Sequence, residues 1–144
     1  MTRRSDLAIR ALLELSGGED RTKAAALAER IGTTKGFLTQ VMTPLVQQGW
    51  VRSDPGPTGG YVADFDADRV SILAVVEAIE GPVDTGRCVL EDRECAQAGT
   101  CALHRPWSRA RAHLLDDLGV GVADARRAVL LAILLDLRVQ RLLQ

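Results

Sequence analysis

The pattern of apolar and polar positions predicts four amphipathic helices in the first 80 residues. Apolar side chains recur there at the i, i+3, i+4, i+7 spacing that places them on one face of a helix. Each of the four stretches ends at a glycine: Gly17, Gly32, Gly49 and Gly81. The third stretch has the clearest stripe, made by Leu38, Val41, Met42 and Leu45.

Small polar residues mark where these helices should begin. We expect Ser5 and Asp6 to cap the first helix and Thr33 or Thr34 to cap the third, because their side-chain oxygens can accept hydrogen bonds from unpaired backbone N–H groups. The second helix is expected to open at Thr22 and the fourth to cover residues 68–80.

A hairpin should follow the third helix directly. Residues 50–52 and 61–63 have the composition of short strands, and residues 53–60 between them are rich in glycine and proline. The second and third helices, separated by a short turn at Gly32, form a helix-turn-helix. A hairpin placed after the second helix of that motif is the wing of a winged helix. The fold class is therefore mainly α, with an N-terminal winged helix-turn-helix domain over residues 1–64.

The pattern changes after the fourth helix. Residues 65–83 form a linker helix, residues 84–105 show no periodicity and contain all three cysteines, and helices resume over residues 106–144. The last helix is apolar nearly all round at residues 129–135, which is more apolar surface than so small a domain can cover. We therefore expect residues 106–144 to form a helical dimerisation region and the chain to be a homodimer.

Composition adds two constraints. The 144 residues are 47% hydrophobic and 26% charged, with a net charge of −1, which fits a folded domain but does not by itself indicate a nucleic-acid binder. The charge is uneven: residues 1–63 have eight Lys and Arg against six Asp and Glu, whereas the rest has ten against thirteen. No export signal or membrane-spanning stretch is apparent, so we expect a cytoplasmic protein with no membrane partner.

The cysteines suggest a metal site. Cys88, Cys95, Cys101 and His104 give the pattern C-x6-C-x5-C-x2-H. Thiolates are soft ligands that favour iron–sulphur clusters, zinc or copper(I), and imidazole can complete the set. Structural zinc sites more often use C-x2-C pairs, so the wide spacing favours a cluster. A zinc site, a thiol switch without a cluster, and three unrelated cysteines are the alternatives.

The order of these pieces resembles the iron–sulphur regulator family typified by IscR and NsrR (the Rrf-two family). The most specific part is Arg87-Cys88 followed by Cys95-x5-Cys101-x2-His104-x2-Trp107. Less specific matches are residues 5–10, the run Thr34-x2-Phe37-Leu38-x-Gln40, and Gly59-Gly60-Tyr61. The resemblance implies a DNA-binding transcriptional regulator that senses redox state, nitric oxide or iron–sulphur supply through a bound cluster.

The resemblance also implies residue roles. His104 matches the fourth ligand of a two-iron cluster, which we favour, and Asp6 matches a fourth ligand given by the other subunit to a four-iron cluster. The homodimer would place two recognition helices in successive major grooves of a double-stranded operator. The residues expected at the DNA are Thr33, Thr34, Lys35, Thr39, Gln40 and Arg52. Pro55-Gly56 stands where the family usually has Arg-Gly in the wing, so Arg52 is the nearest basic substitute.

Two other function classes are alternatives to a regulator. An enzyme with a cysteine nucleophile and His104 or His113 as base would need an oxyanion or phosphate-binding motif, and the sequence shows none. A protein-interaction module that kept the winged helix but lost DNA binding is the second, and the missing wing arginine is its best support. We expect the protein not to be an enzyme.

Overall fold

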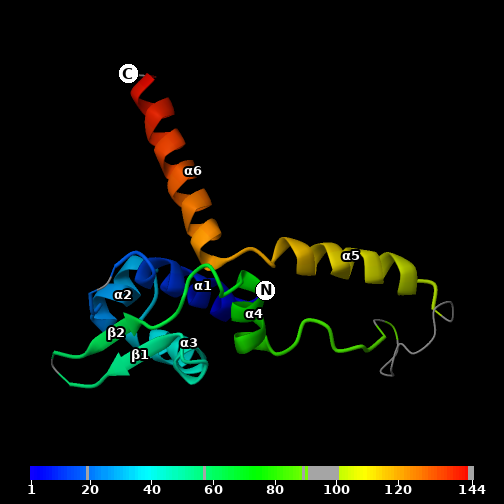
Figure 1. Cartoon of the computed structure of the whole chain (residues 1–144), viewed down its shortest axis with the longest axis horizontal. Helices are drawn as coiled ribbons and strands as arrows, with labels where there is room; N and C mark the ends of the chain where they lie inside the picture. Colours follow the sequence, from blue (N-terminus) through cyan, green and yellow to red (C-terminus); the bar gives the residue numbers. More distant parts are fainter. Residues whose placement is uncertain (19, 57, 89, 91–100, 143–144) are drawn as a thin grey trace.

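The computed structural model describes residues 1–18, 20–56, 58–88, 90 and 101–142, with side chains of the last helix described as far as residue 132. The elements of this part are α1 (Arg3–Leu15), α2 (Ala24–Arg30), α3 (Lys35–Gln47), β1 (Val51–Asp54), β2 (Gly60–Ala63), α4 (Ile72–Glu80), α5 (His104–Asp117) and α6 (Val122–Leu142). Helices α1–α4 and the hairpin form one body, from which α5 and α6 project in different directions (Figure 1). The predicted mainly α fold with a winged helix-turn-helix is confirmed.

The core of this body is aliphatic and lies between α1, α2, α3 and α4. The stripe predicted for the third helix is fully buried, together with Leu12 of α1, Leu27 of α2 and Val75 of α4. Helix α1 packs against both α3 and α4, so it is the central helix of the body. The helical spacing of apolar residues was therefore sufficient to identify the core face of each helix.

Several helices begin elsewhere than the sequence suggested. Helix α2 begins at Ala24, after an N-cap at Lys23, rather than at Thr22. The N-cap of α1 is Thr2, whose side-chain oxygen accepts a hydrogen bond from the Ser5 N–H at 3.4 Å. The expected cap at Ser5 and Asp6 is wrong, because the Ser5 side chain is fully buried and its hydroxyl donates to Glu80 at the end of α4. Helix α4 begins at Ile72 rather than at residue 68, after an N-cap at Ser71.

The hairpin is held against the helices by backbone pairing. Strands β1 and β2 are antiparallel, in a register that pairs Val51 with Ala63 and Asp54 with Gly60. Thr22, just before α2, extends this sheet by exchanging two 2.9 Å backbone hydrogen bonds with Tyr61. A Cβ atom at Gly60 would lie 2.4 Å from the carbonyl oxygen of Thr22, so only glycine fits at this close approach.

The connection between α5 and α6 is anchored on the start of α4. The N–H of Leu73 donates to the carbonyl of Leu118 at 2.7 Å, and the N–H of Val122 donates to the carbonyl of Val70 at 2.8 Å. The Val122 side chain is fully buried. The C-terminal end of α5 and the base of α6 are therefore fixed to the helical body.

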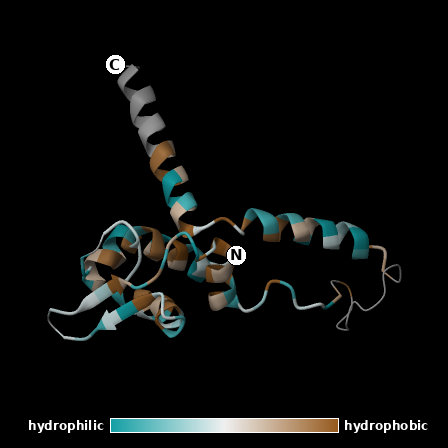
Figure 2. Cartoon of the chain, in the orientation of Figure 1, coloured by the Kyte–Doolittle hydropathy of each residue, from teal (hydrophilic) through white to brown (hydrophobic). Residues whose placement is uncertain are grey.

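Beyond this anchor most of the described residues of both helices are exposed. No described residue of α5 is buried, and its Trp107 and Leu114 are 46% and 48% exposed. Val129, Leu130 and Leu131 of α6 are also exposed, although Val129 and Leu130 line a small pocket with Leu13 and Glu14 of α1. Figure 2 shows hydrophobic positions on α6 above its base. Within the described part of the chain, no helix has both the length and the apolar content needed to cross a bilayer.

Candidate nucleic-acid interface and cysteine pocket

Helix α3 presents a polar face on the outside of the helical body. Its N-cap is Thr34, one of the two residues expected there, and the side chain accepts a hydrogen bond from the Phe37 N–H at 3.3 Å. Lys35, Thr39 and Gln40 are all exposed along the helix, opposite its buried stripe. The structure therefore leaves these four predicted residues accessible, and Lys35 and Thr39, about one turn apart, line the same groove.

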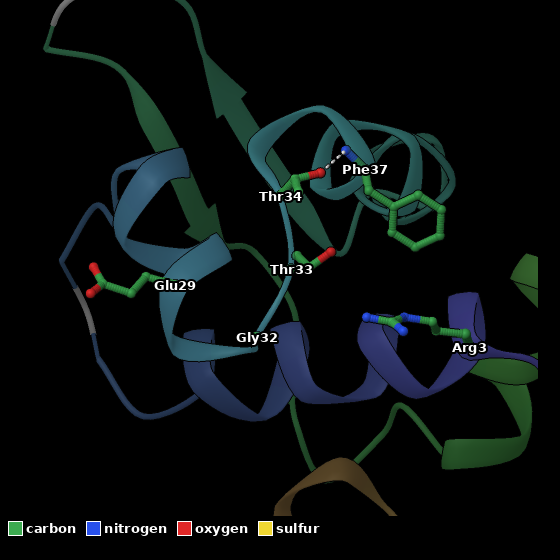
Figure 3. Close-up of a pocket in the computed structure, with 6 residues that line it drawn as sticks. All are labelled: Arg3, Glu29, Gly32, Thr33, Thr34 and Phe37. Carbon is green, nitrogen blue, oxygen red and sulfur yellow. Dashed lines mark hydrogen bonds between the residues drawn. The ribbon is translucent and has the colours of Figure 1, made fainter.

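Thr33 has a different environment from the other residues predicted at the DNA. It is half-buried in an open pocket of about 530 Å³ between α1 and the start of α3. Figure 3 shows Arg3 of α1 reaching into this pocket toward Thr33 and Phe37, whereas the carboxylate of Glu29, on the other side of the pocket, points away from these side chains. Arg3 is thus a cation near the start of α3 that sequence reasoning did not select.

A groove of about 370 Å³ runs between α3 and the wing. Lys35 and Thr39 line one side, and residues of both strands line the other. Lys23, the residue before α2, also lines the groove and is exposed. Two ammonium groups at one groove attract phosphate oxygens. Lys23 was missed because it belongs to no helix stripe and stands outside the expected recognition helix.

Charges in the wing are paired with one another. The Asp54 carboxylate accepts a 2.5 Å hydrogen bond from Arg21 and lies 3.8 Å from the Arg52 guanidinium. Arg21 also donates to the carbonyl of Thr58, which ties the loop before α2 to the wing. Arg52 is exposed as expected, but its charge is partly compensated by Asp54, which lowers its value as a phosphate ligand.

A second polar pocket lies at the start of α5. Cys88, Cys101 and His104 all line this cavity of about 140 Å³, although Cys88 and Cys101 are separated by twelve intervening positions in the sequence. Both thiols are half-buried, and the backbone N–H of His104 donates to the backbone carbonyl of Cys101 at 3.1 Å. Helix α5 begins at His104 itself, two residues before the expected helix start, so the imidazole lies on a helix rather than in a loop.

Charged and aromatic groups of α5 complete the pocket wall. Arg111 forms an ion pair with Asp84 and lies over the Trp107 ring, with its guanidinium carbon 5.8 Å from the ring centroid. All three residues line the same cavity as the cysteines. The other histidine, His113, is exposed and does not line this cavity.

The remaining predicted ligands are not part of this arrangement. Cys95 lies outside the described residues. Asp6 is on α1, where it forms an ion pair with Arg10 at 3.0 Å, and it does not line the pocket of its own chain. Within the described residues, no three His, Cys, Asp or Glu side chains form a group that could hold a metal ion by themselves.

One carboxylate links α1 to the end of α4. Glu80 accepts hydrogen bonds from the Ser5 hydroxyl and, at 2.6 Å, from the Thr2 N–H. The Ser5 hydroxyl first and the Thr2 N–H second hold the pKa of Glu80 below its ordinary value, because both stabilise the charged form. This contact joins the first turn of α1 to the chain that leads into the cysteine pocket.

Comparison with known families identifies the chain. Residues 1–124 match the Rrf2 family model, described as an iron-dependent transcriptional regulator. The chain belongs to the Rrf2 family. The match ends just inside α6, so most of that helix lies beyond the part that is typical of Rrf2 proteins.

Curated relatives are transcriptional regulators. The chain is 31% identical over 122 residues to the HTH-type transcriptional regulator IscR of Xenorhabdus nematophila, which covers 83% of this chain and 73% of the relative. It is 30% identical over 135 residues to IscR of Sodalis glossinidius, covering 92% and 76%. The chain is therefore a transcriptional regulator of the Rrf2 family that binds DNA, and its relatives are not enzymes.

Solved structures show the same fold. CymR of B. subtilis, titled the global cysteine regulator, superposes with a TM-score of 0.74 at 25% identity and covers 89% of this chain and 96% of CymR. IscR of T. potens superposes with a TM-score of 0.71 at 18% identity and covers 90% and 87%. The Rrf2 fold therefore includes proteins named for different regulatory roles.

Proposed function

We propose that this Rrf2 protein is a cytoplasmic, homodimeric transcriptional regulator that senses redox state, nitric oxide or iron–sulphur supply through a bound iron–sulphur cluster. The observation that supports it is the pocket shared by Cys88, Cys101 and His104. His104 is close to Cys101 in the sequence, but Cys88 precedes Cys101 by twelve intervening residues and still lines the same cavity.

The residues present fit such a group. Thiolates are the ligands that iron–sulphur clusters require, and a histidine can replace one of them. Cys88, Cys101 and His104 would hold the cluster together with Cys95, and His104 is the fourth ligand that we favour because it already lines the pocket. A two-iron cluster is the proposed form. Asp6 of a partner subunit, with a four-iron cluster, is the alternative.

When bound, the cluster supplies one-electron redox chemistry and reactivity toward oxidants and nitric oxide. The chain's own residues hold the pocket at the start of α5 and anchor the other end of α5 to α4. Helix α4 in turn packs against α1 and α3. Binding or losing the cluster would order or loosen residues 84–104. Through these contacts it would change the positions of the helices that present the DNA-reading surface.

The DNA surface is proposed to be the exposed face of α3 with the adjoining groove. Lys35 and the start of α3 suit phosphates, and Thr39 and Gln40 can reach base edges. Thr34 caps the start of α3, Thr33 lines the pocket beside it, and Arg52 is exposed on β1 of the wing. Two copies would present two such helices to a palindromic operator.

Dimerisation is proposed through the uncovered helices. Leu114 of α5 and Val129, Leu130 and Leu131 of α6 are between 45% and 59% exposed in the single chain. A second copy of the chain would bury these side chains by an isologous contact. Under this proposal the DNA-binding domain is residues 1–64, and a linker helix over residues 65–83 joins it to the rest of the chain. The cluster is held by residues 84–105, and the dimer is formed by residues 106–144.

Anaerobic purification tests the sensor half of the proposal. We expect a coloured protein that contains iron and acid-labile sulphide in equal amounts, with a visible absorption band that oxygen bleaches. Cys101→Ala and His104→Ala should each lose or alter the cluster, whereas His113→Ala, on the same helix but outside the pocket, should leave it unchanged. A colourless, iron-free wild-type protein prepared without oxygen would refute cluster binding.

The second candidate is a thiol-based or zinc-bound regulator on the same fold. It is favoured by the fold shared with a protein titled a cysteine regulator and by the two half-buried thiols in one pocket. Under this function the purified protein contains zinc or no metal, and its DNA affinity changes when the thiols are oxidised. Metal analysis of the anaerobic sample separates the two candidates directly.

A further inference from the structure

The guanidinium of Arg111 is held on two sides at the wall of the cysteine pocket. It pairs with the Asp84 carboxylate and lies over the Trp107 ring. The Arg111 side chain is only 17% exposed, whereas Arg21, Arg52 and Arg127, which also form ion pairs, are at least 44% exposed. An ion pair whose arginine is mostly shielded from water holds its two chain segments together more strongly than an ion pair whose arginine is solvated.

This pair joins the two stretches of chain that form the pocket. Asp84 lies four residues before Cys88, and Arg111 lies seven residues after His104, on the same face of α5 because seven residues make two helical turns. The segment around Asp84 is also fixed locally: Asp84 accepts from the Gly86 N–H at 2.9 Å, and the Val83 N–H donates to Glu77 of α4 at 3.1 Å.

We propose that Arg111 is a positioning residue of the cysteine pocket. By binding Asp84 it holds the segment that ends at Cys88 against the face of α5 that contains His104, and so it sets how accessible the pocket thiols are. Arginine suits this role because its planar fork can pair with a carboxylate and stack on an aromatic ring at the same time, which lysine cannot do. The proposal deepens the proposed function, but its first test does not depend on a bound cluster.

The first test measures thiol reactivity in the full-length, metal-free, reduced protein. Iodoacetamide alkylation of Cys88 and Cys101 is followed by peptide mass spectrometry in the wild type, Arg111→Gln, Asp84→Asn and the double variant. We expect alkylation of Cys88 to accelerate roughly two- to tenfold in each single variant, and the double variant to be no faster than the singles, because contacting residues are not additive. Arg111→Lys should fall between the wild type and Arg111→Gln.

Arg109→Gln is the matched control, because Arg109 is an exposed arginine of the same helix that does not line the pocket. Its alkylation rates should equal those of the wild type, and far-UV circular dichroism should show the same helix content in every variant. Wild-type alkylation rates in Arg111→Gln would overturn the proposal. The proposal would also be overturned if the rate increases of the two single variants multiplied in the double variant, because the two residues would then act independently.

A second readout uses the anaerobically purified protein with its cluster. We expect Arg111→Gln to shift the visible spectrum and the midpoint potential, and Arg109→Gln to change neither. If the wild type holds no iron, the proposed cluster function fails, while the alkylation experiment still decides whether Arg111 positions the thiols. If the cluster forms and its spectrum and potential are unchanged in Arg111→Gln, Arg111 does not position the ligands.

Discussion

Gly60→Ala is a single-methyl test of how the wing is attached to the helices. At this position a Cβ atom would lie 2.4 Å from the carbonyl oxygen and 2.9 Å from the carbonyl carbon of Thr22. Both are backbone atoms, so no side-chain rotation relieves the contact. The hairpin has to move away from the residue that leads into α2, and this breaks the pairing between Thr22 and Tyr61.

The loss of folding free energy can be estimated from the hydrogen bonds that would break. Thr22 and Tyr61 exchange two backbone hydrogen bonds of 2.9 Å, and a protein hydrogen bond contributes about 0.5–1.5 kcal/mol net. Overpacking a close contact costs about 1–3 kcal/mol on its own. Because the movement that relieves the overlap is the one that breaks the bonds, the two costs overlap, and we expect a loss of about 2–4 kcal/mol. That is a large share of the ~5–15 kcal/mol that stabilises a typical domain.

Urea unfolding followed by far-UV circular dichroism measures this loss. Gly36→Ala is the matched control, since it lies within α3, its added Cβ would meet no atom within 4 Å, and an alanine there should stabilise the helix by about 0.5–1 kcal/mol. The two glycine-to-alanine changes should therefore shift the unfolding midpoint in opposite directions. A Gly60→Ala protein within about 0.5 kcal/mol of the wild type would refute the close-approach argument.

Three further predictions concern pH, DNA and assembly. Because the Glu80 pKa is lowered in the folded chain, its stabilising effect is present above the ordinary value of 4.5 and is lost as the pH falls through the folded value; Glu80→Gln should therefore flatten the acid side of the urea-midpoint profile, and parallel profiles would contradict this. Lys23→Ala should weaken binding to specific and non-specific DNA alike and reduce the salt slope of the binding constant by about one, measured by fluorescence anisotropy; an unchanged slope would remove Lys23 from the phosphate contacts. Leu130→Glu should shift sedimentation toward the monomer by placing a charge in an apolar contact, and an unaffected dimer would exclude this part of α6 from the interface.

The helical body was predictable because its information is local. The stripe of Leu38, Val41, Met42 and Leu45 repeats within one helix, and all four residues are buried as expected. The start of α1 was not predictable. Ser5 has the chemistry of a cap, but its hydroxyl bonds to Glu80, 75 positions away, and no local pattern reveals that contact.

The residues of the candidate site also divide into those that the sequence could identify and those that it could not. Thiols and imidazoles are rare, so Cys88, Cys101 and His104 could be selected by chemistry, and the structure places them in one pocket. Asp84 and Arg111 were missed because charged residues are common and 27 positions separate the pair. A sequence can name the groups with unusual chemistry, whereas the common groups that position them require the fold.

The position of the pocket limits how it can affect DNA binding. Helix α5 has 14 residues and is therefore about 21 Å long, with the pocket at its start and its other end bonded to the start of α4. In the described part of one chain, neither Cys88 nor Cys101 shares a pocket with a residue of α3. Three physical routes connect the pocket with the DNA surface: along the chain through Asp84, Val83 and α4, along α5 to its anchor on the start of α4, or across a dimer in which α5 meets the partner. The Arg111 variants act on the two routes within one chain and Leu130→Glu acts on the route across the dimer, so measuring DNA affinity in both decides whether the signal passes within the chain or through the partner.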